Sequence, residues 1–219
     1  MNLNFSQIVP SIPFILGGIK LTILVVICSV LLGVVLAILL ALMKISRSKW
    51  LIFIADLYTS IFRGTPMVLQ LMIIYFGLPQ IIGYDIAQFP AAVLAFGLNS
   101  GAYVSEIIRA GILAVDKGQT EAAAALGIPY RRMMSKIILP QAFKNILPAL
   151  MNEFITLTKE SAVITVIGAS DLMRRAYLVG GDLYAYMEPL IFVAGVYYVL
   201  VMILTLLGKT VERRLRTND

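Results

Sequence analysis

The chain has 219 residues, of which 60% are hydrophobic and only 14% are charged, with a formal net charge of +6. A soluble domain has about 25% charged residues, so this composition excludes that class and favours an all-α membrane protein. The sequence contains no histidine and one cysteine, Cys28, which excludes histidine-based metal or acid–base sites and an internal disulfide. We predict no metal site and no nucleic-acid binding, because the basic residues lie between apolar segments, where they orient membrane proteins.

The first predicted span covers residues 21–43, which carry no charge and are long enough to cross a bilayer. Lys44, Arg47 and Lys49 follow it without an intervening acidic residue. Cytoplasmic loops of membrane proteins are rich in lysine and arginine. This loop is therefore predicted to be cytoplasmic, which places the amino terminus outside.

The second apolar block, residues 51–82, is interrupted by Asp56 and by the sequence Arg-Gly-Thr-Pro at residues 63–66. Proline pushes the preceding residue away from helical geometry, and glycine loosens the turn before it. We predict one span with a break at residues 64–66. The following loop, residues 79–90, has no basic residue and suits the outer face.

The third predicted span covers residues 91–108. Gly97, Gly101 and Ser105 recur every four residues and therefore share one helix face. Small residues at this spacing allow the backbones of two helices to approach closely. For this face we favour packing within the chain over a subunit interface.

Two more spans are predicted at residues 140–157 and 189–207. Residues 110–144 and the segment after residue 207 are rich in lysine and arginine and are assigned to the cytoplasm. Residues 159–188 are mixed in charge and are assigned to the outside, with residues 162–168 dipping back inward. Five transmembrane helices, with the amino terminus outside and the carboxyl terminus cytoplasmic, satisfy every loop. The whole chain, residues 1–219, is predicted to be one permease-like domain.

Residues 118–129 predict a short helix outside the spans. Thr120 is placed to cap its start, and Glu121 lies in the first turn, where the helix dipole favours a negative charge. Gly127 is placed to end the helix in a left-handed conformation, and Pro129 blocks its continuation. A capped helix with small side chains, built outside the spans of a membrane protein, is typical of a docking element.

Two motifs carry a resemblance to a known family. The pattern Glu-Ala-Ala-x3-Gly-x9-Ile-x-Leu-Pro at residues 121–140 resembles the EAA signature of the permease subunits of bacterial ABC importers. The sequence at residues 63–66, followed by Gln70-Leu71, resembles the branch of that family that takes up polar amino acids such as histidine, arginine, lysine and glutamine. Length, span number and orientation agree with the family, so the resemblance covers essentially the whole chain.

The resemblance implies the type I ABC importer permease fold in the bacterial cytoplasmic membrane. It implies a transport subunit rather than an enzyme, with no cofactor in this chain, and with ATP and Mg held by a partner ATPase. The implied partners are an ABC ATPase subunit dimer, a second permease copy or a paralogue, an extracytoplasmic solute-binding protein, the amino-acid substrate and the lipid bilayer.

The resemblance also assigns residues 118–129 as the cytoplasmic coupling helix that docks on the ATPase. By position, Glu121, Ala122, Ala123 and Gly127 carry over to that role. The alanines would let the helix sit close in a groove, and Glu121 would offer a charge to a basic partner group. The Arg131–Arg132 pair is expected to meet acidic groups of the ATPase, and the alternative is contact with lipid headgroups.

Glu153 is the principal candidate for substrate binding. A charged side chain at bilayer depth costs about 2.5–3.5 kcal/mol, so such residues are functional candidates. An ionised carboxylate facing a cavity would pair with a guanidinium or ammonium group, which predicts a basic amino acid as substrate. Asn99 and Thr156 could add neutral hydrogen bonds. The alternatives are a structural ion pair for Glu153 and an interhelical hydrogen bond for Asn99.

Four other charged residues have positions that suggest mechanical roles. Asp56 is a further candidate for the substrate site, although we favour bracing of the second span for both Asp56 and Arg63. Arg63 could instead lie near a gate at the helix break. Lys159 and Glu160 follow the fourth span and are candidates for an outer gate.

The function predicted from the sequence is therefore that of the transmembrane subunit of an ATP-driven importer of polar, in particular basic, amino acids. The alternative is an ion-coupled secondary transporter that works without an ATPase. Such a protein commonly shows inverted repeats and more intramembrane carboxylates, and the sequence shows no obvious repeat. A membrane scaffold, the third class, would not require Glu153 within a span.

Residues 208–210 resemble the end of a phosphate-binding loop, but Ile203 stands where that pattern needs glycine. The pattern is therefore incomplete, and we do not assign nucleotide binding to this chain.

Overall fold

The computed structural model describes residues 3–216, all in helices, turns and connecting segments. The longest elements are the predicted spans, and the shorter ones cap or connect them. The elements in chain order are η1 (Phe5–Ser11), α1 (Ile12–Leu16), α2 (Ile19–Lys44), α3 (Lys49–Gly64), α4 (Met67–Met72), η2 (Ile73–Gly77), α5 (Leu78–Ile82), α6 (Gln88–Leu113), α7 (Lys117–Ala125), α8 (Tyr130–Met133), η3 (Met134–Ile138), α9 (Leu139–Glu160), η4 (Ser161–Ile167), α10 (Leu172–Asp182) and α11 (Met187–Arg216).

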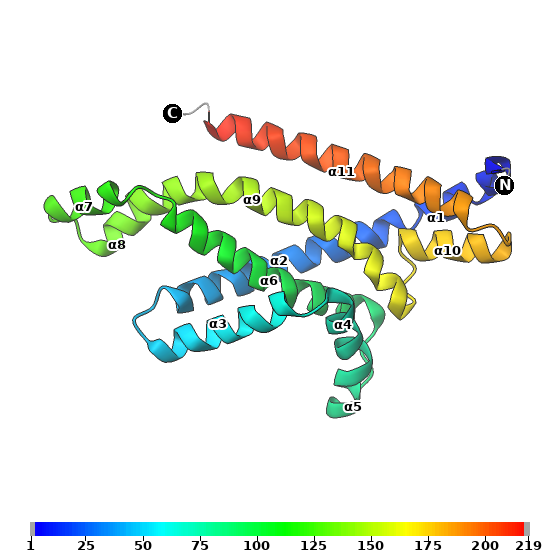
Figure 1. The fold of residues 1–219 in the computed structure, drawn as a ribbon, viewed down its shortest axis with the longest axis horizontal. Coiled ribbons are helices and arrows are strands. Elements are labelled where there is room, and N and C mark those ends of the chain that lie inside the picture. The colour runs from blue at the N-terminus through cyan, green and yellow to red at the C-terminus, as the bar shows by residue number, and fades with distance from the viewer. Residues whose placement is uncertain (1–2, 217–219) are drawn as a thin grey trace.

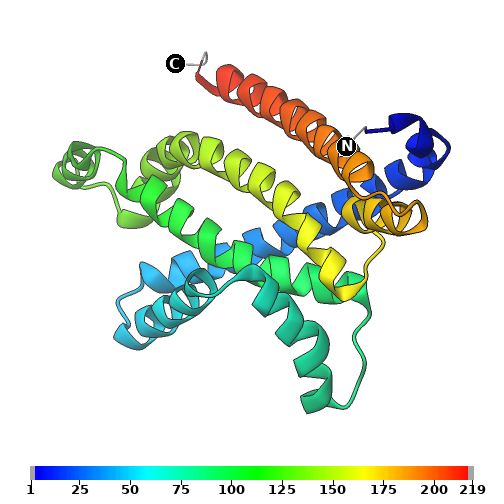
Figure 2. The same cartoon turned by 45° about the vertical axis from the view of Figure 1, so that its right-hand side comes forward.

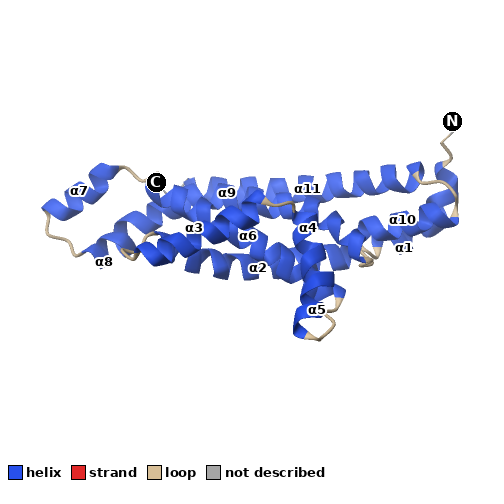
Figure 3. Cartoon of the chain, turned by 60° about the horizontal axis from the view of Figure 1, so that its bottom comes forward, coloured by secondary structure: helices blue, strands red, loops and turns tan. Residues whose placement is uncertain are grey.

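The long helices lie side by side in an elongated bundle (Figure 1). The α2–α3 connection, α7, α8 and the carboxyl-terminal end of α11 gather at one end, and α1 and α10 lie at the other (Figures 1 and 3). The loops that are rich in lysine and arginine therefore share one end of the molecule. This distribution matches the sidedness that the positive-inside rule predicts.

Three helices of the described chain are long and apolar enough to cross a membrane, or four if a bent pair counts as one span. They are the helix ending at Lys44, α6 and α11, and the bent pair is α3 with the α4–η2–α5 segment. The predicted fourth span is α9, a helix of 22 residues. It is about 33 Å long, but Lys144, Glu153 and Lys159 make it more polar than the others.

The most extensive helix packing joins α2 to α6. A Cβ atom built on Gly97 would lie 2.6 Å from Leu32, and one built on Gly101 would lie 3.0 Å from the Leu36 side chain. Ser105, on the same face, is fully buried. The small-residue face of α6 therefore packs within the chain, as expected, because only small side chains admit this separation.

Replacing Gly101 with valine is expected to destabilise the protein by about 1–3 kcal/mol, the usual cost of overpacking. The added methyl groups would meet Leu36 and the carbonyl oxygen of Gly33, 3.5 Å from the Cβ position. Thermal unfolding in detergent would measure the loss. Gly195→Val is the matched control, since nothing lies within 4 Å of its Cβ position. Equal losses in the two variants would contradict the packing argument.

The predicted break in the second span is confirmed. Helix α3 ends at Gly64, and the next helical segment, residues 67–82, leaves at an angle of 104°. Thr65 and Pro66 are extended, with ψ values of 148° and 138°. The α4–η2–α5 arm consequently projects away from the bundle (Figures 1 and 2).

The segment after α9 folds back into the protein interior, as predicted for residues 162–168. Ile164 is fully buried in a cluster that also contains Leu71 of α4 and Phe96 of α6. Gly168 has φ of 77°, so the turn that ends η4 uses the left-handed conformation that glycine adopts readily.

Candidate functional site

Helix α7 is the predicted docking helix, and it starts earlier than predicted. It begins at Lys117, because the Asp116 side chain accepts a hydrogen bond from the Gly118 amide at 2.6 Å. Thr120 therefore lies inside the helix, and its predicted role as the cap is wrong. Aspartate is at least as good an N-cap as threonine, so the earlier of two candidate caps starts the helix.

The end of α7 is as predicted. Gly127 has φ of 66°. Its amide donates to the carbonyl of Ala124, and the Ile128 amide donates to that of Ala123, both at 3.0 Å. This pair of bonds is the Schellman arrangement, which satisfies carbonyls that the last helical turn leaves free. The chain reverses there without needing a partner to hold it.

The exposed face of α7 differs from the one that the motif suggested. Ala123 is only 2% exposed and packs with Met133 and Ile138, so it anchors the helix and is not available to touch a partner. Ala123 must therefore be removed from the predicted docking surface. Glu121 and Ala122 are exposed, and Leu126 is 78% exposed. An apolar side chain this exposed at the end of the predicted docking helix is a candidate contact residue that sequence reasoning missed.

Glu153 lines a cavity of about 250 Å³ between α2, α6 and α9. The other walls are mainly apolar and include Val30, Val104 and Phe154. Ser100 also lines it, and its hydroxyl lies close to the Glu153 carboxyl group. No described basic side chain forms an ion pair with Glu153. A carboxylate beside a hydroxyl in an apolar cavity forms a site suited to a cationic polar ligand.

Asn99 does not contribute its amide to this cavity. Its Nδ2 atom donates to the carbonyl of Phe62 and to Oε1 of Gln70, each at 3.0 Å. Both amide hydrogens are therefore committed to the break between α3 and α4. The substrate-binding role predicted for Asn99 is corrected to the interhelical hydrogen bond that was its alternative. Thr156 is half-buried on α9, one turn beyond Glu153, and does not line the cavity.

The side-chain amide of Gln70 bonds the backbone at the break between α3 and α4. Its Nε2 atom lies 2.9 Å from the Phe62 carbonyl, 3.1 Å from the Thr65 carbonyl and 2.8 Å from the Thr65 hydroxyl. Carbonyls freed at the end of a helix need partners when water is excluded. The polar residue that follows the Arg-Gly-Thr-Pro sequence therefore has a structural reason to be there.

Replacing Gln70 with leucine is expected to cost about 1–3 kcal/mol of unfolding free energy, because it leaves the Thr65 carbonyl without this donor and the Phe62 carbonyl with the Asn99 amide alone. Gln80→Leu is the control on the same arm, since its amide contacts only the Phe76 carbonyl of its own helix and is exposed. Thermal unfolding and protease accessibility of the arm would be compared. A Gln70→Leu protein as stable as Gln80→Leu would show that the break does not depend on this amide.

Asp56 lies in a charge cluster that joins α2, α3 and α6. The buried ammonium group of Lys44 contacts Asp56 at 3.1 Å and also bonds Glu106. Glu106 in turn contacts Arg109 at 2.8 Å. Asp56 lies outside the Glu153 cavity, so its candidate role in substrate binding is not supported, and the geometry agrees with the favoured bracing role.

Arg63 also contacts α6. Its guanidinium carbon lies 5.3 Å from the centre of the Tyr103 ring, a cation–π contact. This contact ties the end of α3 to α6, as bracing requires. Lys159 and Glu160 are exposed at the end of α9 and lie outside the Glu153 cavity.

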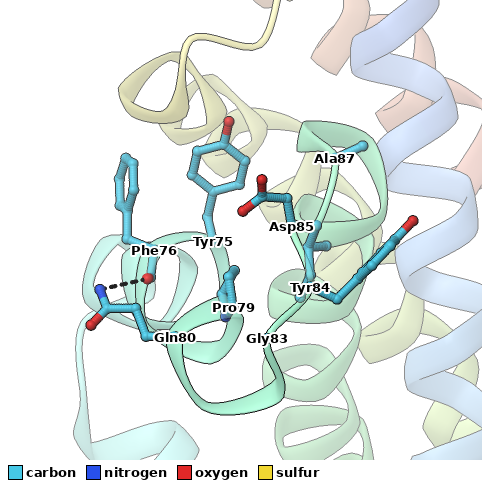
Figure 4. A pocket seen from close by; sticks show the side chains of 9 residues that line it. Tyr75, Phe76, Pro79, Gln80, Gly83, Tyr84, Asp85 and Ala87 are labelled. Carbon is cyan, nitrogen blue, oxygen red and sulfur yellow. Dashed lines mark hydrogen bonds between the residues drawn. The ribbon is translucent and has the colours of Figure 1, made fainter.

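A second cavity, of about 770 Å³, lies between η2, α5 and the loop that follows (Figure 4). Its lining includes the rings of Tyr75 and Tyr84 and the carboxylate of Asp85. It opens on the projecting arm, away from Glu153. All of its lining residues are exposed or half-buried.

The structure has spanning helices with an acidic cavity between them, and an exposed, capped helix at one end. These features are those of a multi-pass transport subunit with a docking element. Comparison with known proteins gives the same class. Residues 29–217 match the family described as the binding-protein-dependent transport system inner membrane component. The chain belongs to this family, and is therefore a multi-pass permease subunit of the inner membrane, without a catalytic role of its own.

Curated relatives and a solved structure identify the branch of the family that the chain resembles. The chain is 63% identical, over the full length of both proteins, to the arginine transport system permease protein ArtQ of Bacillus subtilis. It is 50% identical to a putative glutamine transport system permease protein GlnP of Rickettsia felis, covering 95% of this chain and 96% of that protein. A crystal structure of an amino acid ABC transporter with histidines is 44% identical, with a TM-score of 0.93, covering 98% of this chain and 100% of the other. The predicted membership of the polar amino-acid branch is confirmed.

Proposed function

We propose that this permease moves basic amino acids inward across the cytoplasmic membrane by alternating access. It does so as a dimer with a second copy or a paralogue, with five spans per chain, the amino terminus outside and the carboxyl terminus inside. An ATPase dimer, which holds ATP and Mg, attaches at the cytoplasmic end. An extracytoplasmic solute-binding protein delivers the substrate.

The observation that carries this proposal is how α7 is attached to the bundle. Ala123 and Ile128 pack into a cluster that contains Ile112 of α6 and Ile146 of α9. A displacement of α7 by the ATPase would therefore move both helices rather than bend a loose loop. Glu153 lies two turns along α9 from Ile146, about 10.5 Å at 1.5 Å per residue. Helix α9, which contains Pro148 between these two residues, thus connects the cluster that holds α7 to the acidic cavity.

The substrate class follows from Glu153 and from the branch. A carboxylate in an apolar cavity pairs best with a cation, and a guanidinium can bond it through two N–H groups. The relatives are named for the transport of arginine and of glutamine. Both of these amino acids carry a polar nitrogen group at the end of the side chain. Because Glu153 has no described cationic partner, we propose a basic amino acid.

Copurification and reconstitution test this function. The permease, expressed with an ABC ATPase subunit of an amino-acid importer, is expected to copurify with that subunit and to accumulate arginine in proteoliposomes only when ATP and binding protein are present. Uptake driven by an ion gradient, without nucleotide or ATPase, would instead establish the secondary transporter. Uptake of neutral amino acids alone would retain the importer and reject the basic substrate.

A further inference from the structure

An apolar groove of about 440 Å³ runs along the outside of the bundle between α2, α6 and the segment that follows α7. Its floor and walls come from α2 and α6, and its rim comes from α8, η3 and the start of α9. Ile38 and Leu42 of α2, Ile108 and Ile112 of α6, and Met134 and Leu139 line it.

Most of this lining would be unfavourable in water. Ile38 is 48% exposed, Leu42 is 56% exposed and Leu139 is 44% exposed. The two walls belong to helices long and apolar enough to cross a membrane. An apolar groove between spanning helices lies at the depth of lipid chains, so an acyl chain is the occupant of matching chemistry.

The rim of the groove carries a positive charge. Arg131 lines the groove, is exposed and makes no ion pair with a described residue. The phenol of Tyr130, whose side chain is 67% exposed, stands beside it. Basic and aromatic residues at the end of a span are the usual contacts for lipid headgroups, and basic pockets between helices on the cytoplasmic side bind anionic ones.

We propose that this groove binds one anionic phospholipid of the cytoplasmic leaflet, with an acyl chain along α2 and α6 and its phosphate on Arg131. The inference rests on the orientation given under the proposed function. The proposal gives the two arginines of the docking region different roles, because Arg132 does not line the groove. Arg131 then contacts lipid, and Arg132 remains available to the ATPase. The lipid bridges α2 to the segment that follows α7.

Native mass spectrometry of the permease–ATPase complex, exchanged into detergent with equal phosphatidylglycerol and phosphatidylcholine, tests the proposal. The parent is expected to retain phosphatidylglycerol preferentially. Arg131→Gln should lower that preference about fivefold, the effect of roughly one basic contact. Leu42→Trp, which fills the groove from an exposed position, should lower retention of both lipids. Arg132→Gln should leave the preference unchanged.

Several results would overturn the proposal. Equal retention of the two lipids by the parent, or equal effects of Arg131→Gln and Arg132→Gln, would remove the headgroup site. A photocrosslinker placed at Leu42 that captured the ATPase or a second permease copy would assign the groove to a protein contact. Arginine uptake by the same preparations is read separately. A parent protein that shows no lipid preference but takes up arginine rejects only this inference, whereas a parent protein that does not take up arginine rejects the proposed function.

Discussion

Replacing Glu153 with glutamine is expected to weaken the uptake affinity for arginine about 10- to 100-fold. A hydrogen bond to a charged group contributes about 1.5–3 kcal/mol, and the amide keeps the shape but removes the charge. Half-saturating arginine concentration and maximal rate would be measured in proteoliposomes with the ATPase and binding protein present. The effect should fall mainly on arginine and lysine, because neutral substrates do not pair with the carboxylate.

Asp182→Asn is the matched control for this prediction, since it removes an exposed carboxylate at the end of α10, away from the cavity. Its uptake should equal that of the parent. Copurification of the ATPase with each variant confirms that assembly is intact. Parent-like arginine affinity in an assembled Glu153→Gln protein would remove Glu153 from the substrate site.

Replacing Leu126 with glutamate is expected to weaken association with the ATPase about 30-fold or more, and with it ATP-dependent uptake. A hot-spot residue at the centre of a protein interface contributes about 2 kcal/mol or more, and burying an unpaired carboxylate adds a penalty. The side chain is 78% exposed in the permease, so the permease itself should fold normally. Binding of purified ATPase to immobilised permease would measure the change.

The conservative change Leu126→Met serves as the comparison, because it keeps the volume and apolar character of the side chain. It should preserve both binding and uptake. If Leu126→Glu bound the ATPase as tightly as Leu126→Met, the exposed end of α7 would not be part of the contact. The proposed docking surface would then exclude Leu126 and keep Glu121, Ala122 and Arg132.

Local rules predicted the elements of this fold well. The α2 and α6 spans follow from uncharged length, the break at residues 64–66 follows from proline and glycine, and the end of α7 follows from Gly127. Each of these signals depends on the backbone preferences of a few adjacent residues. The packing partners of each helix were harder to predict from the sequence, although the small-residue face of α6 correctly indicated a close approach within the chain.

The assignments that failed depend on which way a side chain faces in three dimensions. Asn99 is polar within a span, which favours either a ligand or a hydrogen bond to a neighbouring helix. Only the position of Gln70, 29 residues earlier, distinguishes the two. Ala123 lies within the docking motif, but the pitch of the helix turns it inward. Thr120 failed for a different reason, because Asp116 is the better cap of the two and lies earlier in the chain.

The hydrogen-bonded break between α3 and α4 has a consequence for proton leakage across the membrane. A helix bent by 104° within a span would leave carbonyls that attract water, and a file of water would conduct protons down the membrane potential. Here the amides of Gln70 and Asn99 bond the carbonyls of Phe62 and Thr65, so fewer carbonyls at the bend attract water. These bonds thus lower the tendency of a sharply bent span to conduct protons.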